Sequence, residues 1–155
     1  MKTTLITPAE VLALAFPSTE CQREELVGET MIETARIRWL EPVLGPLCAV
    51  LGEERYKDFT DEYIKPALAY YVRYLALAEC SAHVATFGVV QGYTAYAKTA
   101  PQETLTLLRK QARSLADTLL NKAVAHVEND PERFPEYDPE QNVGKRVLFK
   151  GGFIL

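Results

Sequence analysis

The sequence contains few cysteines and no clustered positive charge, and each shortage restricts the class of protein. Its three cysteines, Cys21, Cys48 and Cys80, are an odd number without close spacing, which disfavours a disulfide framework and a Cys-x-x-Cys site. No basic block offsets the formal net charge of −4, which arises from 17 Lys and Arg against 21 Asp and Glu. A protein whose main task is to grip nucleic-acid phosphates is therefore disfavoured.

Long uncharged apolar runs are also missing. The first residues, 1–4, lead into no apolar core of a signal peptide, so we expect a cytoplasmic protein with free, buried thiols. The most apolar stretch, 61–87, carries Lys65, Arg73 and Glu79, and their spacing leaves no run of the roughly 20 uncharged residues that a bilayer span needs. We expect a soluble core helix there and no membrane partner.

Known catalytic motifs are lacking as well. The sequence has no Gly-x-x-x-x-Gly-Lys-Ser/Thr loop and no dinucleotide fingerprint. If one helix extends through His83, then Glu79, Cys80 and His83 share a side of it at a spacing that metal ligands can adopt. The rest of such a site is missing because His126 is the only other histidine. A core histidine is the stronger interpretation, and we expect no catalytic, cofactor-binding or metal-binding residues.

What the sequence does contain is helical periodicity on the scale of one domain. At 155 residues and 48% apolar composition, the chain is long enough to bury a core without disulfides or metals. Apolar residues in 61–87 recur every three or four positions, which predicts a long central helix. They are Ile64, Leu68, Tyr71, Leu75, Ala78 and Ala82. An aromatic band of Tyr70, Tyr71 and Tyr74 accompanies them, and such a band is more often core than pocket lining.

Three further helices are predicted from their caps and stops. Residues 7–10 form a capping box with proline at the first helical position. A long helix then runs from 19 to about 40, where Pro42 and Gly45 interrupt it. The last long helix begins at a cap in 99–102. Its predicted apolar stripe consists of Leu105, Leu108, Ala112, Leu115, Leu119, Ala123 and Val127.

Three segments predict other conformations. Residues 87–96 combine glycines with β-branched and aromatic residues, which indicates a loop or short hairpin. Prolines and acidic residues in 129–144 argue against a packed element. Residues 143–155 form an apolar, extended arm. The sequence thus predicts an all-α bundle of about four to five helices, with a helical domain at 1–142 and a C-terminal arm at 143–155.

Four stretches occur in an order that resembles the small head-tail connector proteins of tailed bacteriophages and prophages, also called adaptor or head-completion proteins. They are residues 5–11 (LITPAEV), 35–45 (ARIRWLEPVLG), 63–71 (YIKPALAYY) and 86–90 (TFGVV). All are packing and turn motifs, and the resemblance covers roughly residues 5–135.

The resemblance implies a non-catalytic structural protein of the virion neck that is made in the cytoplasm of the bacterial host. Copies would form a ring, dodecameric by the resemblance, that joins the portal and head to the tail. The implied partners are other copies, the portal protein and downstream neck or tail proteins, while DNA only passes through the channel. We assign subunit and portal contacts to the glycine-rich loop and the arm. The assigned residues are Val89, Tyr93, Tyr96, Phe149, Phe153, Ile154 and Leu155.

Two alternatives stay open from the sequence. The first is a stopper or tail-completion protein at another level of the same neck. The second belongs to another class, a small helical enzyme or ligand-binding module that would use the tyrosine band together with Glu79 and His83.

Overall fold

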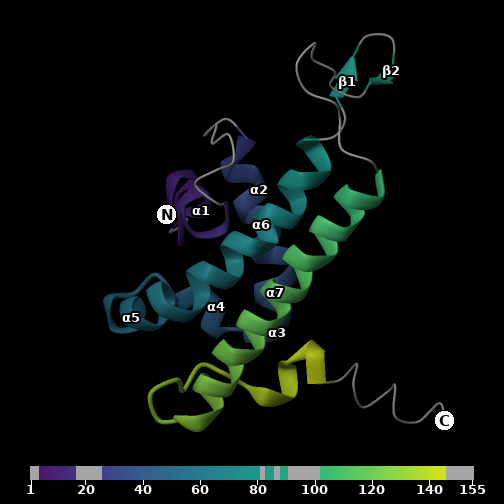
Figure 1. Ribbon diagram of the computed structural model, residues 1–155. Coiled ribbons are helices and arrows are strands. Elements are labelled where there is room, and N and C mark those ends of the chain that lie inside the picture. The colour runs from purple at the N-terminus through teal and green to yellow at the C-terminus, as the bar shows by residue number, and fades with distance from the viewer. Residues whose placement is uncertain (1–3, 17–25, 81–82, 86–87, 91–101, 146–155) are drawn as a thin grey trace, which may run out of the picture.

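The computed structural model describes residues 4–16, 26–80, 83–85, 88–90 and 102–145. Within these ranges the protein is a bundle of α-helices with one short two-stranded hairpin, which confirms the predicted all-α class. Two long helices, α6 and α7, lie side by side and run in opposite directions (Figure 1). The helices are α1 (Pro8–Ala15), α2 (Glu29–Ala35), α3 (Glu41–Leu44), α4 (Leu47–Val50), α5 (Lys57–Phe59), α6 (Lys65–Cys80) and α7 (Gln102–Asn129).

Helix α6 is the central element of the bundle, as its periodicity predicted. It contacts α1, α2 and α7, because its apolar side chains point to more than one side. Its buried residues are Ala67, Leu68, Ala69, Tyr71, Val72, Arg73, Ala76 and Leu77. The helix ends at Cys80, earlier than the predicted Phe87, because the β-branched and glycine residues that follow favour strands and turns.

Alanines line the seam between α6 and α7 and allow these helices to approach closely. On α7 the seam residues Ala112, Ala116 and Ala123 are at most 3% exposed. The predicted stripe of α7 is therefore buried in part. Ala112, Ala123 and Val127 are in the core, whereas Leu115 is 41% exposed. A leucine in the seam would hold the two helix axes further apart, since the distance between packed helices depends on the side chains at the contact.

Two prolines lie inside helical runs. Pro42 and Pro66 each follow a five-residue π-helical segment, Arg36–Leu40 or Thr60–Ile64, and one further residue. In each case the N–H of the residue before the proline bonds to a carbonyl five positions back. The wider turn accommodates the proline, which has no N–H and whose ring would press on the carbonyl four residues back in an α-helix. The predicted interruption at Pro42 is wrong, because α3 continues to Leu44.

Two glycines set the ends of the run from α2 to α3. Gly28 is the extended N-cap of α2, so helix begins at Glu29 and the predicted continuous helix from residue 19 to 40 is wrong. Gly45 ends α3 with a φ of +55° and a ψ of −132°, a conformation that residues with a Cβ rarely adopt.

A hairpin lies between α6 and α7 in the chain. Its strands β1 (His83–Ala85) and β2 (Gly88–Val90) pair antiparallel, with Val84 opposite Val89. The hairpin lies beyond the ends of the two long helices (Figure 1). Of the predicted loop or hairpin at 87–96, the described residues 88–90 form one strand of a hairpin whose other strand begins earlier, at His83. Residues 87 and 91–96 lie outside the described residues.

The segment 130–145, which we call the C-terminal hook, packs against the bundle. Phe134 is 1% exposed and Asn142 is 4% exposed, so the prediction that 129–144 holds no packed element is wrong. The prolines of the hook exclude a long helix or central strand, yet they do not prevent a single aromatic side chain from entering the core. Residues 143–145 are helical, so the arm does not begin as extended chain at residue 143.

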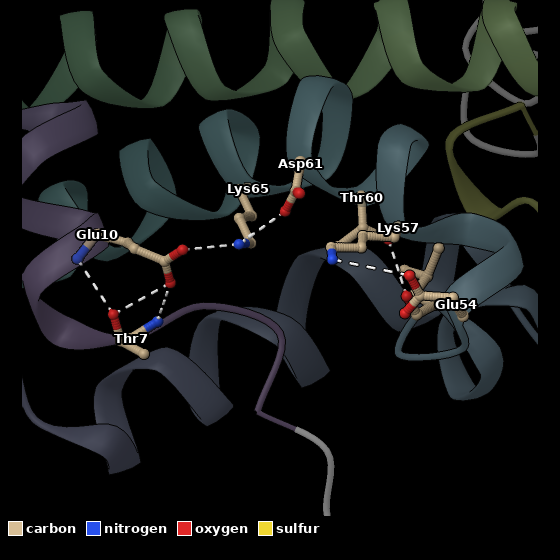
Figure 2. A network of polar contacts seen from close by, with 8 residues as sticks. Thr7, Glu10, Glu54, Lys57, Thr60, Asp61 and Lys65 are labelled. Atoms are coloured by element: carbon tan, nitrogen blue, oxygen red, sulfur yellow. Dashed lines mark hydrogen bonds and ion pairs between the residues drawn. The ribbon is translucent and has the colours of Figure 1, made fainter.

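A polar network ties α1 to the helical run that contains α6 (Figure 2). Thr7 and Glu10 form the predicted capping box, in which the Thr7 N–H donates to Glu10 Oε2 at 2.8 Å and the Glu10 N–H donates to Thr7 Oγ1 at 3.3 Å. Lys65 Nζ lies 2.7 Å from both Glu10 Oε1 and Asp61 Oδ1. Thr60 Oγ1 donates to a buried backbone carbonyl at 2.9 Å. Thr60 begins the π-helical segment before α6 and Lys65 directly follows it, so side-chain contacts hold both ends of this segment.

We expect Glu10→Gln to remove a pH-dependent part of the free energy of unfolding. The hydrogen bond from Lys65, followed by those from Thr7, holds the pKa of Glu10 below its usual 4.5. The stabilisation is therefore present above that pH and lost as pH falls through the lowered pKa. Because the Glu10 side chain is 42% exposed, we expect about 0.5–1 kcal/mol.

Urea unfolding of wild type and Glu10→Gln from about pH 6 to about pH 3 measures this difference. Glu62→Gln is the control, because it removes one negative charge from the exposed side of the same helical run without touching the network. A difference between wild type and Glu10→Gln that stays constant over this pH range would contradict the prediction.

Candidate interaction surface

One of the residues assigned to subunit or portal contacts lies in the described structure. Val89 is the central residue of β2 and pairs with Val84 across the hairpin. The others lie outside the described residues, so their assignment stays a prediction. They are Tyr93, Tyr96, Phe149, Phe153, Ile154 and Leu155.

The hairpin and the last described residue lie at opposite ends of the α6–α7 pair (Figure 1). Helix α7 has 28 residues, which corresponds to about 42 Å. The hairpin precedes its first turn in the chain, whereas Lys145 forms an ion pair with Glu128 in its last turn. The C-terminal arm therefore leaves the bundle at the end opposite to the hairpin.

Aromatic packing and hydrogen bonds hold the C-terminal hook in place. The Phe134 ring lies 5.4 Å from the Tyr56 ring and 4.8 Å from the Phe59 ring. The Tyr56 hydroxyl donates to Glu136 Oε2 at 2.5 Å, and Arg55 pairs with Glu136 Oε1 at 2.5 Å. Burial and the Glu136 carboxylate raise the pKa of Tyr56 to about 12, so this hydroxyl stays a donor at physiological pH.

A second set of contacts fixes the end of the hook. The Tyr137 hydroxyl donates to Glu128 Oε1 at 2.9 Å and accepts a hydrogen bond from Asn142 Nδ2 at 3.0 Å. Burial is the main cause that raises the pKa of Tyr137 to about 12. Since Glu128 also pairs with Lys145, the starting point of the arm is tied to the C-terminal turn of α7.

The structure separates the residues of the alternative enzyme site. Tyr71 is 1% exposed, and its hydroxyl donates to Asp117 Oδ1 at 2.6 Å. Burial, followed by the Asp117 carboxylate, raises the pKa of Tyr71. Glu79 is exposed near the end of α6, and His83 belongs to β1 and not to that helix. In the described ranges, no group of three or more His, Cys, Asp or Glu could hold a metal ion.

A cluster of aromatic and cationic side chains, which the sequence did not reveal, packs the π-helical segment Arg36–Leu40 against α6 and α7. The Trp39 and Tyr71 rings stack with centroids 4.6 Å apart, and Tyr74 meets Trp39 edge-on at 5.8 Å. The Arg113 guanidinium lies 5.1 Å from the Trp39 centroid, while its Nε donates to both oxygens of Asp117 at 3.0 and 3.1 Å. These partners are distant in the chain, so periodicity within one segment gives no signal for them.

An open groove lies between α1 and α7 and crosses α6, with a volume of about 430 Å³, and Arg73 and Gln111 line it together with apolar side chains. Leu14 of α1 and Leu115 of α7 line it and are 42% and 41% exposed. Leu108 and Tyr70 are half-buried and complete its apolar walls. We call this surface the α1–α7 groove. Exposed leucines that line a common hollow are candidates for contact with another chain.

The floor of the α1–α7 groove is well anchored. Arg73 is 8% exposed, and its Nη1 donates to the Ala15 carbonyl at 3.1 Å, at the C-terminal end of α1. Its guanidinium also lies 4.9 Å from the centroid of the Phe16 ring. A cation at this helix end interacts favourably with the unpaired carbonyls, so the end of α1 that carries Leu14 is held on α6.

The fold and these surfaces define a small all-α protein with an open groove and a hook that sets where its C-terminal arm begins. The model of a family of unknown function, DUF6712, matches residues 24–147, and the chain belongs to this family. Comparison with curated proteins and with solved structures found no match. Among the described residues, no helix is long and apolar enough to cross a membrane.

Proposed function

We propose that this protein is a non-catalytic structural component of the neck of a tailed phage or prophage. In this proposal, copies of the chain form a ring that joins the portal and head to the tail. The order of the stretches at 5–11, 35–45, 63–71 and 86–90, which resembles that of head-tail connector proteins, motivates the proposal. The all-α bundle around α6 is the fold that this resemblance implies.

The observation that carries the proposal is that the hairpin and the last described residue, Lys145, lie at opposite ends of the bundle. A hairpin lies at one end of the α6–α7 pair, and the C-terminal arm starts at Lys145 near the other end, about 40 Å away. A subunit between a portal and a tail needs contacts on two opposite sides and with its neighbours. The hairpin at one end and an arm that starts from the other end would supply such contacts, and neither contact needs an enclosed binding site.

A stopper or tail-completion protein of the same neck differs from this proposal in its partner, since it would bind a ring already attached to the portal. The enzyme alternative assumed that Glu79 and His83 share one side of a helix beside the tyrosine band. Because α6 ends at Cys80 and Tyr71 is buried, we do not favour this alternative.

The proposal is tested with the portal protein from the same genome. We expect the purified chain to bind portal rings directly in a pull-down and to appear as a closed ring on them in negative-stain electron microscopy. Binding only to portal rings that already carry another neck protein would favour the alternative of a stopper or tail-completion protein. A protein that binds no neck component and stays monomeric at every concentration in native mass spectrometry would contradict both.

A further inference from the structure

The α1–α7 groove exposes leucines that belong to an apolar stripe of α7. Successive residues of an α-helix are about 100° apart, which places Leu108 and Leu115 within about 20° of each other. Ala116 is about 100° further around, faces α6 and is fully buried. The stripe thus lies on a side of α7 about 100° away from Ala116. Its Leu108 and Leu115 line the groove together with Leu14 of α1. The described residues cover this stripe only in part, since Leu108 is half-buried and Leu115 is exposed.

The C-terminal arm has the composition that such a groove would accept. Residues 146–155 (RVLFKGGFIL) contain six large apolar residues and two charged ones, Arg146 and Lys150. Leucine walls and the tyrosine ring at the groove suit aliphatic and aromatic side chains, and burial of each such side chain contributes favourably to binding.

The position of Lys145 argues that a chain's own arm does not fill its own groove. Lys145 is paired with Glu128, which follows Leu115 by 13 positions in α7. Leu115 and Glu128 therefore lie about 20 Å apart along the axis of α7 and about 140° apart around it. Phe149 follows Lys145 by four residues, a reach of at most about 14 Å.

The first apolar run of the arm, which contains Phe149, is thus too close to Lys145 to reach the groove of the same chain. Only the second run, 153–155, could arrive there, and it would need nearly full extension around α7. An arm from a neighbouring copy has no such constraint and could place both runs in the groove.

We infer that the α1–α7 groove binds the C-terminal arm, residues 146–155, of a second copy of this chain. The contact joins two different surfaces, so it is heterologous, and its repetition around an axis closes a ring. The inference deepens the proposed function and rests on it for its role in the neck, because it names the contact between neighbouring subunits.

The first experiment measures self-association of the full chain by analytical ultracentrifugation over a range of concentrations. Leu115→Glu places a charge in the groove, and Leu107→Glu is the matched control, since Leu107 is 56% exposed on the same helix and does not line the groove. We expect Leu115→Glu to weaken association at least about tenfold and Leu107→Glu to leave it unchanged. Equal effects of the two variants, or no effect of either, would overturn the inference.

The second experiment identifies the occupant with a labelled peptide of residues 146–155. The peptide is titrated into a chain that ends at Lys145, whose cooperative unfolding is first verified by circular dichroism. We expect binding by fluorescence anisotropy, at least about tenfold weaker binding with Leu14→Glu or Leu115→Glu, and dissociation of the full-length oligomer by excess peptide. A full chain that is monomeric and excludes the peptide would show docking within one chain and would overturn the inference.

These results are separable from the portal experiment. Arm exchange without portal binding would retain the subunit contact and remove the neck function. The chain could instead bind the portal while its self-association is unchanged by removal of the arm and by Leu115→Glu. That result would retain the neck function and remove the contact proposed here.

Discussion

Phe134→Ala is expected to lower the free energy of unfolding by about 3–5 kcal/mol. Phe134 is 1% exposed, and its ring packs against the rings of Tyr56 and Phe59. Alanine would leave a cavity between the hook and the bundle, which the surrounding side chains could fill only in part. Loss of this anchor would also loosen the Tyr56–Glu136 hydrogen bond. Urea unfolding followed by far-UV circular dichroism measures the effect.

Val143→Ala is the matched control for Phe134→Ala, because it truncates another apolar side chain of the hook that is 43% exposed. We expect this control to cost less than about 0.5 kcal/mol. If the two variants unfold at the same urea concentration, the hook does not contribute to the core as the structure indicates. If Phe134→Ala alone is destabilised, a truncation that tests the arm must end at or after Lys145.

Trp39→Ala is expected to have an effect of similar size, about 3–5 kcal/mol. Trp39 is 7% exposed and stacks on Tyr71 with an angle of 7° between the rings. Its removal forfeits the buried area, the stack, which contributes about 0.5–1.5 kcal/mol beyond that area, and the contact with the Arg113 guanidinium. The loss would weaken the packing of the π-helical segment Arg36–Leu40 against the α6–α7 pair.

The measurement is again urea unfolding followed by circular dichroism, since Trp39 is the single tryptophan and its fluorescence disappears with the substitution. Trp39→Phe keeps an aromatic ring over Tyr71 and is expected to lose less stability than Trp39→Ala. Ile37→Ala serves as the control, because Ile37 is 48% exposed on the same helical run. A cost for Trp39→Ala no larger than that of Ile37→Ala would show that the stack is not part of the stabilising core.

Much of the helical framework was predictable because its signals are local. The capping box of Thr7 and Glu10 forms as expected. Helix α7 is described from Gln102 onward, and the rest of its predicted cap, 99–101, lies outside the described residues. The central position of α6 followed from apolar residues on several of its sides. Proline misled the prediction at Pro42, because a π turn can carry a helix through a proline when the tertiary packing favours continuation.

The candidate interaction surface was less predictable than the framework. Leu108 and Leu115 have the same spacing as the core alanines Ala112 and Ala123, and the sequence does not say that the alanines are buried while Leu115 stays exposed. Phe134 stands in a segment rich in prolines and acids, where only its contact with Tyr56 and Phe59 reveals a core residue. Both outcomes depend on side chains that are remote in the chain.

The sequence by itself determined the all-α class, the cap of α1 and the central role of α6. These follow from periodicity and capping, which act within a few residues. Only the tertiary structure decided that Leu14 and Leu115 remain exposed in a groove, that the hook enters the core through Phe134, and that Lys145 starts the arm beside Glu128. The physical reason is that burial depends on which faces of distant segments meet, and local spacing does not specify that choice.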